Sequence, residues 1–302
     1  MENRETDAAT GVETTGHDWD GIKELNNPLP RWWLWTFYAT IIWSIGYVIA
    51  YPAIPLVTDA TKGVLGYTSR GEVAAEMAAV EAARSNKVAR IAELSINGIA
   101  EDKELYQFAV SAGRSAYKVH CSQCHGSGAT GAAGYPNLND DDWLWAGDLE
   151  GIAATIRHGV RFAGDDDSRF AEMPAFGRDQ LLGKSEIASI AAYVASFSNI
   201  EHDPALAGEG EPLYATNCAA CHGAKGEGDR DQGAPNLRDP IWLYGGTLDE
   251  IIVQIGAPKH GVMPGWGDRL GEPLVKQLAI YVHSLGGGEE TAWQPPPNPR
   301  ER

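Results

Sequence analysis

The most hydrophobic part of the chain is one uncharged stretch near the amino terminus. Residues 32–58 contain no Asp, Glu, Lys or Arg, and a cluster of tryptophans stands at their start. About 20 apolar residues are enough for a helix to cross a bilayer, and aromatic rings favour the two membrane interfaces. The pattern predicts a single transmembrane anchor in a lipid bilayer, whose helix is ended by Pro52 and Pro55.

A cleavable signal peptide is the competing interpretation of this stretch. Residues 1–31 form a long, mostly polar lead, and no convincing small-residue cleavage site follows the apolar run. We therefore expect the anchor at residues 32–58 to stay in the mature protein. The segment before it is expected to be cytoplasmic.

The polar remainder of the chain carries helical patterns. Residues 72–96 are rich in alanine and place apolar side chains on roughly one face, which predicts an amphipathic helix inside a spacer at residues 59–104. Apolar stripes with helical spacing recur at residues 187–194 and 275–282. The predicted fold is mainly α.

An internal repeat divides the carboxy-terminal two thirds. Pro136-Asn137-Leu138 corresponds to Pro235-Asn236-Leu237, and Trp143-Leu144-Trp145 corresponds to Trp242-Leu243-Tyr244. Each copy ends on one of the two apolar stripes. The order of these features indicates a duplicated unit.

The repeat sets the expected domain boundaries. The first domain is expected at residues 105–201 and the second at residues 202–286. The proline-rich tail at residues 287–302 is predicted to be disordered.

Both repeats contain the sequence Cys-X-X-Cys-His. It occurs as Cys121-Ser122-Gln123-Cys124-His125 and as Cys218-Ala219-Ala220-Cys221-His222, and these are all the cysteines of the chain. The spacing is typical of covalent attachment of a c-type haem, in which the two sulfurs bind the porphyrin and the histidine ligates iron. A zinc site would draw about four ligands from one cluster, and a redox dithiol has no need of the histidine. We expect two covalently bound haems c.

Two methionines are candidate sixth ligands of the haem irons. Met173 and Met263 fall one in each repeat, and each is followed by a proline that fixes the loop backbone. Thioether sulfur opposite imidazole is a ligand pair of electron carriers. Each methionine is expected to serve the haem of its own repeat. His158 and His260 are the rival ligands, and methionines that only fill a core are the plainer alternative.

The net charge limits the partners. The formal charge is −17 at neutral pH, which argues against nucleic acid binding. Acidic runs such as Asp140-Asp141-Asp142 could steer a basic electron donor or could serve only solubility.

The order of features in each repeat resembles class I cytochrome c. An amino-terminal helix leads into the haem motif, a Pro-X-Leu turn and a methionine loop follow, and a helix ends the unit. In that family the proline carbonyl accepts a hydrogen bond from the proximal histidine, a role that the resemblance assigns to Pro136 and Pro235. The resemblance implies two tandem class I cytochrome c domains after one amino-terminal transmembrane helix.

The amino-terminal residues carry a more specific resemblance. The segment from Thr14 to Ile22, together with Asn27 to Trp33, is similar to the start of the dihaem cytochrome c subunit of cbb3-type cytochrome c oxidases. That family implies an electron relay from a soluble or membrane-bound donor cytochrome c. The relay passes through a membrane cytochrome c subunit to a catalytic subunit with b-type haems that reduces oxygen.

The same resemblance implies a location. Bacterial c-type haem is attached outside the cytoplasmic membrane, so residues 59–302 are expected in the periplasm with the anchor in the inner membrane. On its own the chain is not expected to be an enzyme, and it has no predicted catalytic residues.

Two other functions fit parts of the sequence. A dihaem peroxidase needs an iron with a vacant or displaceable ligand position, whereas this chain offers a methionine for each iron. A dihaem carrier could also feed another membrane complex, such as a dehydrogenase or a nitric oxide reductase. Only the amino-terminal resemblance argues against that alternative.

Overall fold

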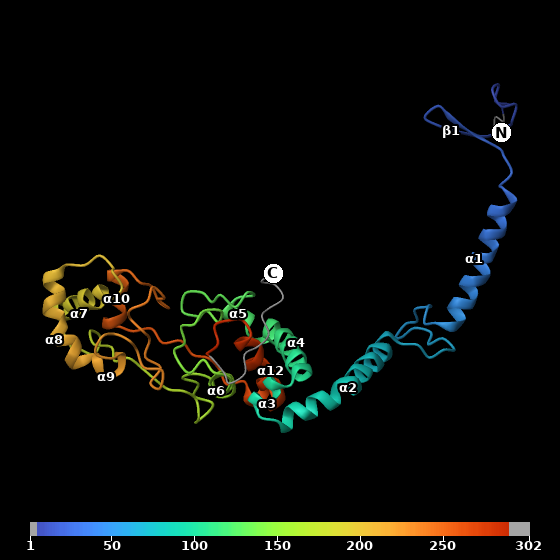
Figure 1. The fold of residues 1–302 in the computed structure, drawn as a ribbon. Helices are drawn as coiled ribbons and strands as arrows, with labels where there is room; N and C mark the ends of the chain where they lie inside the picture. Colours follow the sequence, from blue (N-terminus) through green and yellow to red (C-terminus); the bar gives the residue numbers. More distant parts are fainter. Residues whose placement is uncertain (1–4, 290–302) are drawn as a thin grey trace. The chain divides into compact units, whose positions relative to one another are not determined.

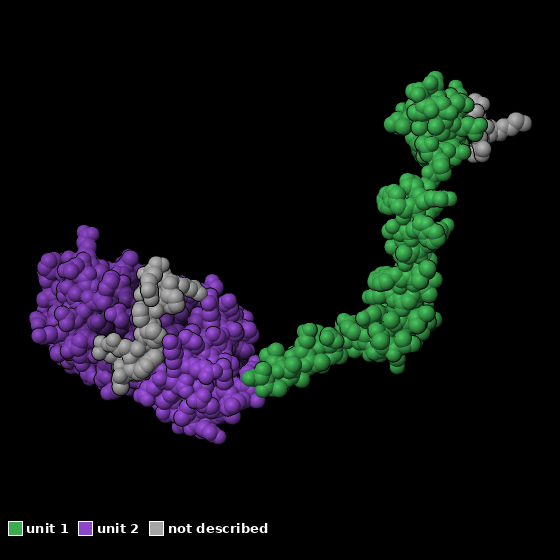
Figure 2. Space-filling model, turned by 45° about the vertical axis from the view of Figure 1, so that its right-hand side comes forward, with its two compact units in different colours: residues 1–83 green, residues 84–302 purple. Residues whose placement is uncertain are grey.

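The protein is mainly helical, as predicted. The computed structural model describes residues 5–289 and contains two compact units, residues 1–83 and residues 84–302 (Figures 1 and 2). From residue 290 onward, the predicted disordered tail lies outside the described residues.

The first unit begins with a β-hairpin that the sequence analysis missed. Strands β1 (Thr14–Trp19) and β2 (Ile22–Leu25) pair antiparallel. Asp20 and Gly21 between them both have left-handed backbones, with φ of +52° and +88°. An Asp-Gly pair is the preferred filling of a tight hairpin turn, because both central residues need positive φ. That pair was the signal available in the sequence.

Helix α1 (Arg31–Ala50) forms the predicted anchor. It is long and apolar enough to cross a membrane, with a mean hydropathy of 1.4 and no buried residue. At about 1.5 Å per residue its length matches the roughly 30 Å hydrocarbon layer. The hydroxyls of Thr36, Thr40 and Ser44 each donate to a carbonyl of the preceding turn, so these polar groups are paired within the helix. Residues 51–58 are not helical, because Tyr51 is extended and Pro52 follows.

The amphipathic pattern predicted at residues 72–96 forms helix α2 (Ser69–Glu93). Its apolar residues Val73, Met77 and Val80 are exposed, and Ile91 is its only buried residue. Packing therefore holds only the last turns of α2, which belong to the second unit.

Short helices surround the two Cys-X-X-Cys-His motifs in the second unit (Figure 1). Side chains of Ser95, Asp102, Asp148, Asp203 and Thr247 accept backbone hydrogen bonds at the starts of five of them, which satisfies free N–H groups. The helices are α3 (Ile96–Glu101), α4 (Lys103–His120), α5 (Ser122–His125), α6 (Leu149–His158), α7 (Lys184–Phe197), α8 (Pro204–Asn217), α9 (Ala219–His222), α10 (Leu248–Gly256), α11 (Gly267–Leu270) and α12 (Glu272–His283).

The two hydrophobic cores of this unit each combine segments from both repeats. Helix α12, which ends the second repeat, packs on α4 and α6 of the first repeat. Helix α7, which ends the first repeat, packs on α8 and α10 of the second repeat. The expectation that each repeat closes on its own last helix is therefore wrong. The boundaries at residues 105–201 and 202–286 stay a prediction for the sequence repeats.

Glycines allow the exchanged helices to cross closely. A Cβ on Gly113 of α4 would overlap the carbonyl of Gln277 in α12, and one on Gly210 of α8 would overlap the carbonyl of Ser189 in α7. Tyrosines pack beside each crossing, with Tyr117 and Tyr281 rings 5.5 Å apart at the first. The two crossings are thus built alike, and each joins a helix of the first repeat to a helix of the second.

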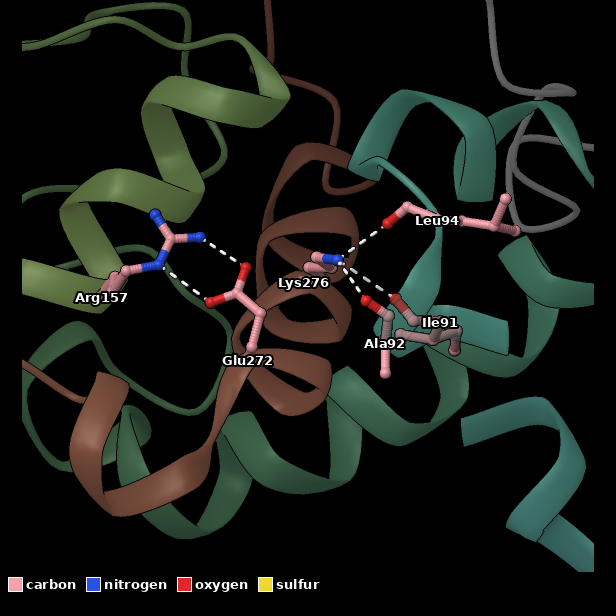
Figure 3. A network of polar contacts seen from close by, with 6 residues as sticks. All are labelled: Ile91, Ala92, Leu94, Arg157, Glu272 and Lys276. Atoms are coloured by element: carbon pink, nitrogen blue, oxygen red, sulfur yellow. Dashed lines mark hydrogen bonds and ion pairs between the residues drawn. The ribbon is translucent and has the colours of Figure 1, made fainter. Parts of the chain in front are cut away.

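Polar contacts also attach α12 to the first repeat and to the end of α2 (Figure 3). Arg157 of α6 donates two hydrogen bonds to Glu272, at 2.9 and 2.6 Å. The Lys276 ammonium donates to the carbonyls of Ile91, Ala92 and Leu94 at the end of α2. A forked Arg–carboxylate pair and a three-carbonyl site fix the helix in rotation as well as position.

Acidic side chains meet where the repeats touch. Burial, with the nearby Asp239 and Asp140, raises the pKa of Asp142 to about 6, and Arg230 partly opposes this. Burial also raises the pKa of Asp140. Ionised carboxylates at this seam therefore cost stability at neutral pH.

Replacement of Gly113 tests the helix crossing. In Gly113→Ala the new methyl group forces α4 and α12 apart, which should lower the free energy of unfolding by about 1–3 kcal/mol. Gly208→Ala is the matched control, because nothing lies within 4 Å of its Cβ position in α8. That change should be neutral or stabilise by roughly 0.5–1 kcal/mol. Equal effects of the two substitutions on thermal unfolding would contradict the close crossing.

Replacement of Asp142 tests the acidic seam. A carboxyl with a raised folded-state pKa contributes stability at low pH and loses it as the pH rises through its folded pKa. As the pH rises from 3.8, the ordinary pKa of an aspartate, to about 6, the native protein should lose stability that the Asp142→Asn variant keeps. At neutral pH the variant should melt roughly 2–4 °C higher than the native protein, a shift that corresponds to about 1 kcal/mol. Near pH 4 the two melting temperatures should be nearly equal. Asp166→Asn, at an exposed position, serves as control. If Asp142→Asn and the native protein differed in melting temperature by the same amount at every pH, the raised pKa of Asp142 would be refuted.

Candidate haem-binding sites

The first Cys-X-X-Cys-His motif follows directly on helix α4. Cys121 caps the carboxy end of α4, and the next residues form the short helix α5 that ends at His125. The His125 Nδ1 lies 3.0 Å from the Pro136 carbonyl oxygen. Since a carbonyl can only accept, Nδ1 carries the hydrogen and Nε2 keeps its lone pair for a metal. Burial lowers the pKa of His125 against the opposing effect of this hydrogen bond, which favours the neutral ring.

The second motif repeats this arrangement. The His222 Nδ1 lies 3.1 Å from the Pro235 carbonyl oxygen, and burial lowers the pKa of His222 as well. Two tyrosines support the motifs in the same way. Tyr117 donates to the Gly126 carbonyl at 2.8 Å, and Tyr214 donates to the Gly223 carbonyl at 2.9 Å. The sequence analysis missed the role of these tyrosines, although each stands four residues before the first cysteine of its motif.

The four cysteines are free and differ in exposure. Cys121 is half-buried and Cys218 buried, whereas Cys124 and Cys221 are exposed. Burial raises the pKa of both Cys121 and Cys218 to about 11. A reactive dithiol needs a thiol with a lowered pKa. The surroundings therefore disfavour the redox-dithiol alternative.

The structure brings each candidate methionine to the motif of the other repeat. Met263 packs on the core that contains Tyr117 and Cys121. Its backbone exchanges two hydrogen bonds with Val160, at 2.9 and 3.0 Å. The Trp266 ring lies 5.4 Å from that of His120, directly before the first motif. The expectation that Met263 serves the second motif is therefore corrected.

Met173 is placed by the corresponding contacts on the second core. It packs with Tyr214 and Cys218. The amides of Gly177 and Arg178 both donate to the Gly256 carbonyl at the end of α10. Each methionine therefore lies on the same core as the last helix of its repeat. Met173 and α7 are on the second core, and Met263 and α12 are on the first.

The rival histidines lie at other contacts. The His158 Nδ1 lies 2.9 Å from an Asp165 carboxylate oxygen, so this ring has a partner within its own loop. His260 is exposed. Met263 and Met173, by contrast, pack on the hydrophobic cores at the two motifs.

Two further features bear on whether a haem fits these residues. A cavity of about 780 Å³ borders Cys221 of the second motif and has Trp143 and Ile241 among its lining residues. In the described part of the chain, the buried Nε of Arg169 has no hydrogen-bond partner, and its guanidinium stacks over Trp145 at 5.1 Å. A haem carries two propionates, and an anion would satisfy such a donor. Two thiols, a neutral imidazole and a thioether are together the donor set of a His–Met haem c. The Nε–H of Arg169 adds a donor of the kind that a propionate accepts from, while its Nη2 donates to the Gly151 carbonyl.

Two family models match the chain. The model described as the N-terminal domain of cytochrome oxidase-cbb3, FixP, matches residues 11–58. The model described as cytochrome c oxidase, cbb3-type, subunit III, matches residues 108–194 and 205–282. The second model thus matches both sequence repeats and more than half of the chain.

Curated relatives agree with the family models along nearly the whole chain. A cbb3-type cytochrome c oxidase subunit FixP of Sinorhizobium medicae is 56% identical over 95% of this chain and 99% of the relative. The subunit CcoP of Cereibacter sphaeroides is 50% identical over 91% of this chain and 95% of the relative. The chain therefore belongs to the family of FixP and CcoP subunits, subunit III, of cbb3-type cytochrome c oxidases.

Proposed function

We propose that the chain binds two haems c and passes electrons through them to the catalytic subunit of a cbb3-type oxidase. When bound, each haem supplies a one-electron redox centre. The observation that carries the proposal is that the same donor set occurs twice. Each set has two cysteines, a proximal histidine held by a proline carbonyl, and a methionine on the same core.

The residues of the first site have distinct roles in this proposal. Cys121 and Cys124 would form the thioethers, and His125 and Met263 would ligate the iron. Pro136 orients the His125 ring and increases the basicity of its free nitrogen. In the second site the thioethers would come from Cys218 and Cys221, and the iron ligands would be His222 and Met173. Pro235 orients the His222 ring.

The membrane arrangement follows from haem attachment. Because c-type haem is attached outside the bacterial cytoplasmic membrane, we place residues 1–31 in the cytoplasm and residues 59–302 in the periplasm. Helix α1 holds the chain in the inner membrane. Its partners in this proposal are the catalytic subunit with b-type haems and a membrane cytochrome c subunit.

The electron donor is proposed to be a soluble or membrane-bound cytochrome c. The chain carries a net charge of −17, and exposed acidic groups such as Asp141 and Asp167 lie in the second unit. A negative surface attracts a basic donor and favours fast, short-lived encounters. The chain itself supplies no oxygen-reducing site in this proposal.

Substitution of each methionine tests the crossed ligation. We expect Met263→His to lower the reduction potential of the haem at His125 only, because a bis-histidine iron has a lower potential than a His–Met iron. Met173→His should act on the haem at His222 only. Spectroelectrochemical titration, with Cys218→Ser and Cys221→Ser removing the second haem, assigns each signal. The opposite pairing would contradict the proposed ligand sets.

Purification in mild detergent by a carboxy-terminal tag tests the function. The purified material should contain b-type haem and should consume oxygen when a reduced donor cytochrome c is added. The chain lacking both haem motifs, with all four cysteines replaced by serine, is the control. Two haems c with other partners, without b-type haem or oxygen uptake, would favour a carrier for another membrane complex.

A further inference from the structure

The two methionine loops meet at one small β-like crossing. Val160 pairs through its backbone with Arg169 in its own repeat and with Met263 in the other. It is also the buried centre of this crossing, with 8% of its surface exposed. Neighbouring residues are open to solvent, since Phe170 is 69% and Val262 60% exposed. Beside Val160, hydrogen bonds rather than apolar contacts therefore hold these stretches of the two loops.

One side chain reaches both loops. Arg161 follows Val160 and is half-buried. Its Nε donates to the Gly261 carbonyl at 2.6 Å, and its Nη1 donates to the Ala171 carbonyl at 2.9 Å. Gly261 stands two residues before Met263, and Ala171 stands two residues before Met173.

We propose that Arg161 is a positioning residue for both distal methionines at once. Its guanidinium binds the chain two residues before Met173 and two residues before Met263, so a single side chain fixes both loops relative to each other. This inference rests on the proposed role of the two methionines as haem ligands.

The chemistry of the side chain suits this role. A guanidinium holds its donors in a rigid fork and keeps its charge at all physiological pH values, whereas a lysine ammonium is a single point on a flexible stem. Hydrogen bonds from a charged donor are stronger than neutral ones, and more so where water is partly excluded.

The backbone conformation of Arg161 also supports this role. Its φ is +53°, in the left-handed region that costs free energy for any residue with a Cβ. Its amide donates to the Arg169 carbonyl at 2.7 Å, which holds the strained turn. Glycine would adopt this φ without cost, so any advantage of an arginine here lies in its side chain.

Two substitutions separate the side chain from the backbone. Arg161→Gly relieves the left-handed strain but removes the fork, and Arg161→Lys keeps the charge but cannot reach both carbonyls in the same geometry. Each variant is made in the full-length chain, purified in detergent and checked for covalently bound haem. The red absorption band of methionine-ligated ferric haem and the reduction potentials of both haems are then measured.

Arg157→Lys is the matched control. Arg157 also forms a forked pair, but with Glu272 of α12 (Figure 3). Helix α12 belongs to the core on which Met263 packs. The substitution should therefore affect at most the haem at His125. The Met173→His and Met263→His variants assign each spectroscopic signal to one haem.

The expected result is that both Arg161 variants weaken the methionine band and lower the reduction potential at both haems, with Arg161→Gly the more severe. Unchanged signals, or a change at one haem only, would overturn the inference. If Arg161→Gly fails to accumulate with haem, Arg161→Lys is judged by the same criterion. Silent methionine variants would instead refute the proposed ligands, so the two failures are distinguishable.

Discussion

The backbone hydrogen bonds between Val160 and Met263 decide how the second unit is connected. Near this point the chain of each repeat passes from one core to the other. The first repeat passes from the core that contains α6 to the core that contains α7, and the second passes from the core of α10 to that of α12. The methionine loop and the last helix then follow as one continuous segment, so they are exchanged together. Helix α12 consequently completes the core around α4, and α7 completes the core around α8. Neither core is closed by residues of one repeat alone.

This connectivity makes the two cores dependent on each other. A domain of the size of one repeat buries a limited apolar surface and has little stability to spare. Here the core around Ile99 and Leu105 gains Val275, Leu278 and Ile280 from a helix far along the chain. Contacts between segments so distant in sequence are slow to form, because closing the long intervening loop costs entropy. The first core is therefore completed only after nearly all of the second unit is present.

Sequence reasoning worked where the deciding information is local. The haem motifs, the proline carbonyls that accept from His125 and His222, the membrane helix and the amphipathic helix each lie within a short segment. The exchange could not be predicted in this way, because both repeats offer the same parts. Each has a Met-Pro loop, a glycine at the helix crossing, as in Gly113 and Gly210, and an apolar final helix. Either helix could close either core by pattern alone, and what decides is the geometry of the loops.

The exchange also divides control of each proposed haem environment between the repeats. The proximal side is local, since the cysteines, the histidine and the proline that orients it come from one repeat. The distal side comes from the other repeat, through Met263 for the first site and Met173 for the second. Reduction potential depends on both axial ligands and on their surroundings. With the proposed ligand sets, a substitution before the crossing should act on the haem of its own repeat, whereas one beyond the crossing should act on the haem of the other. The arginine at the crossing is the position from which both can change together.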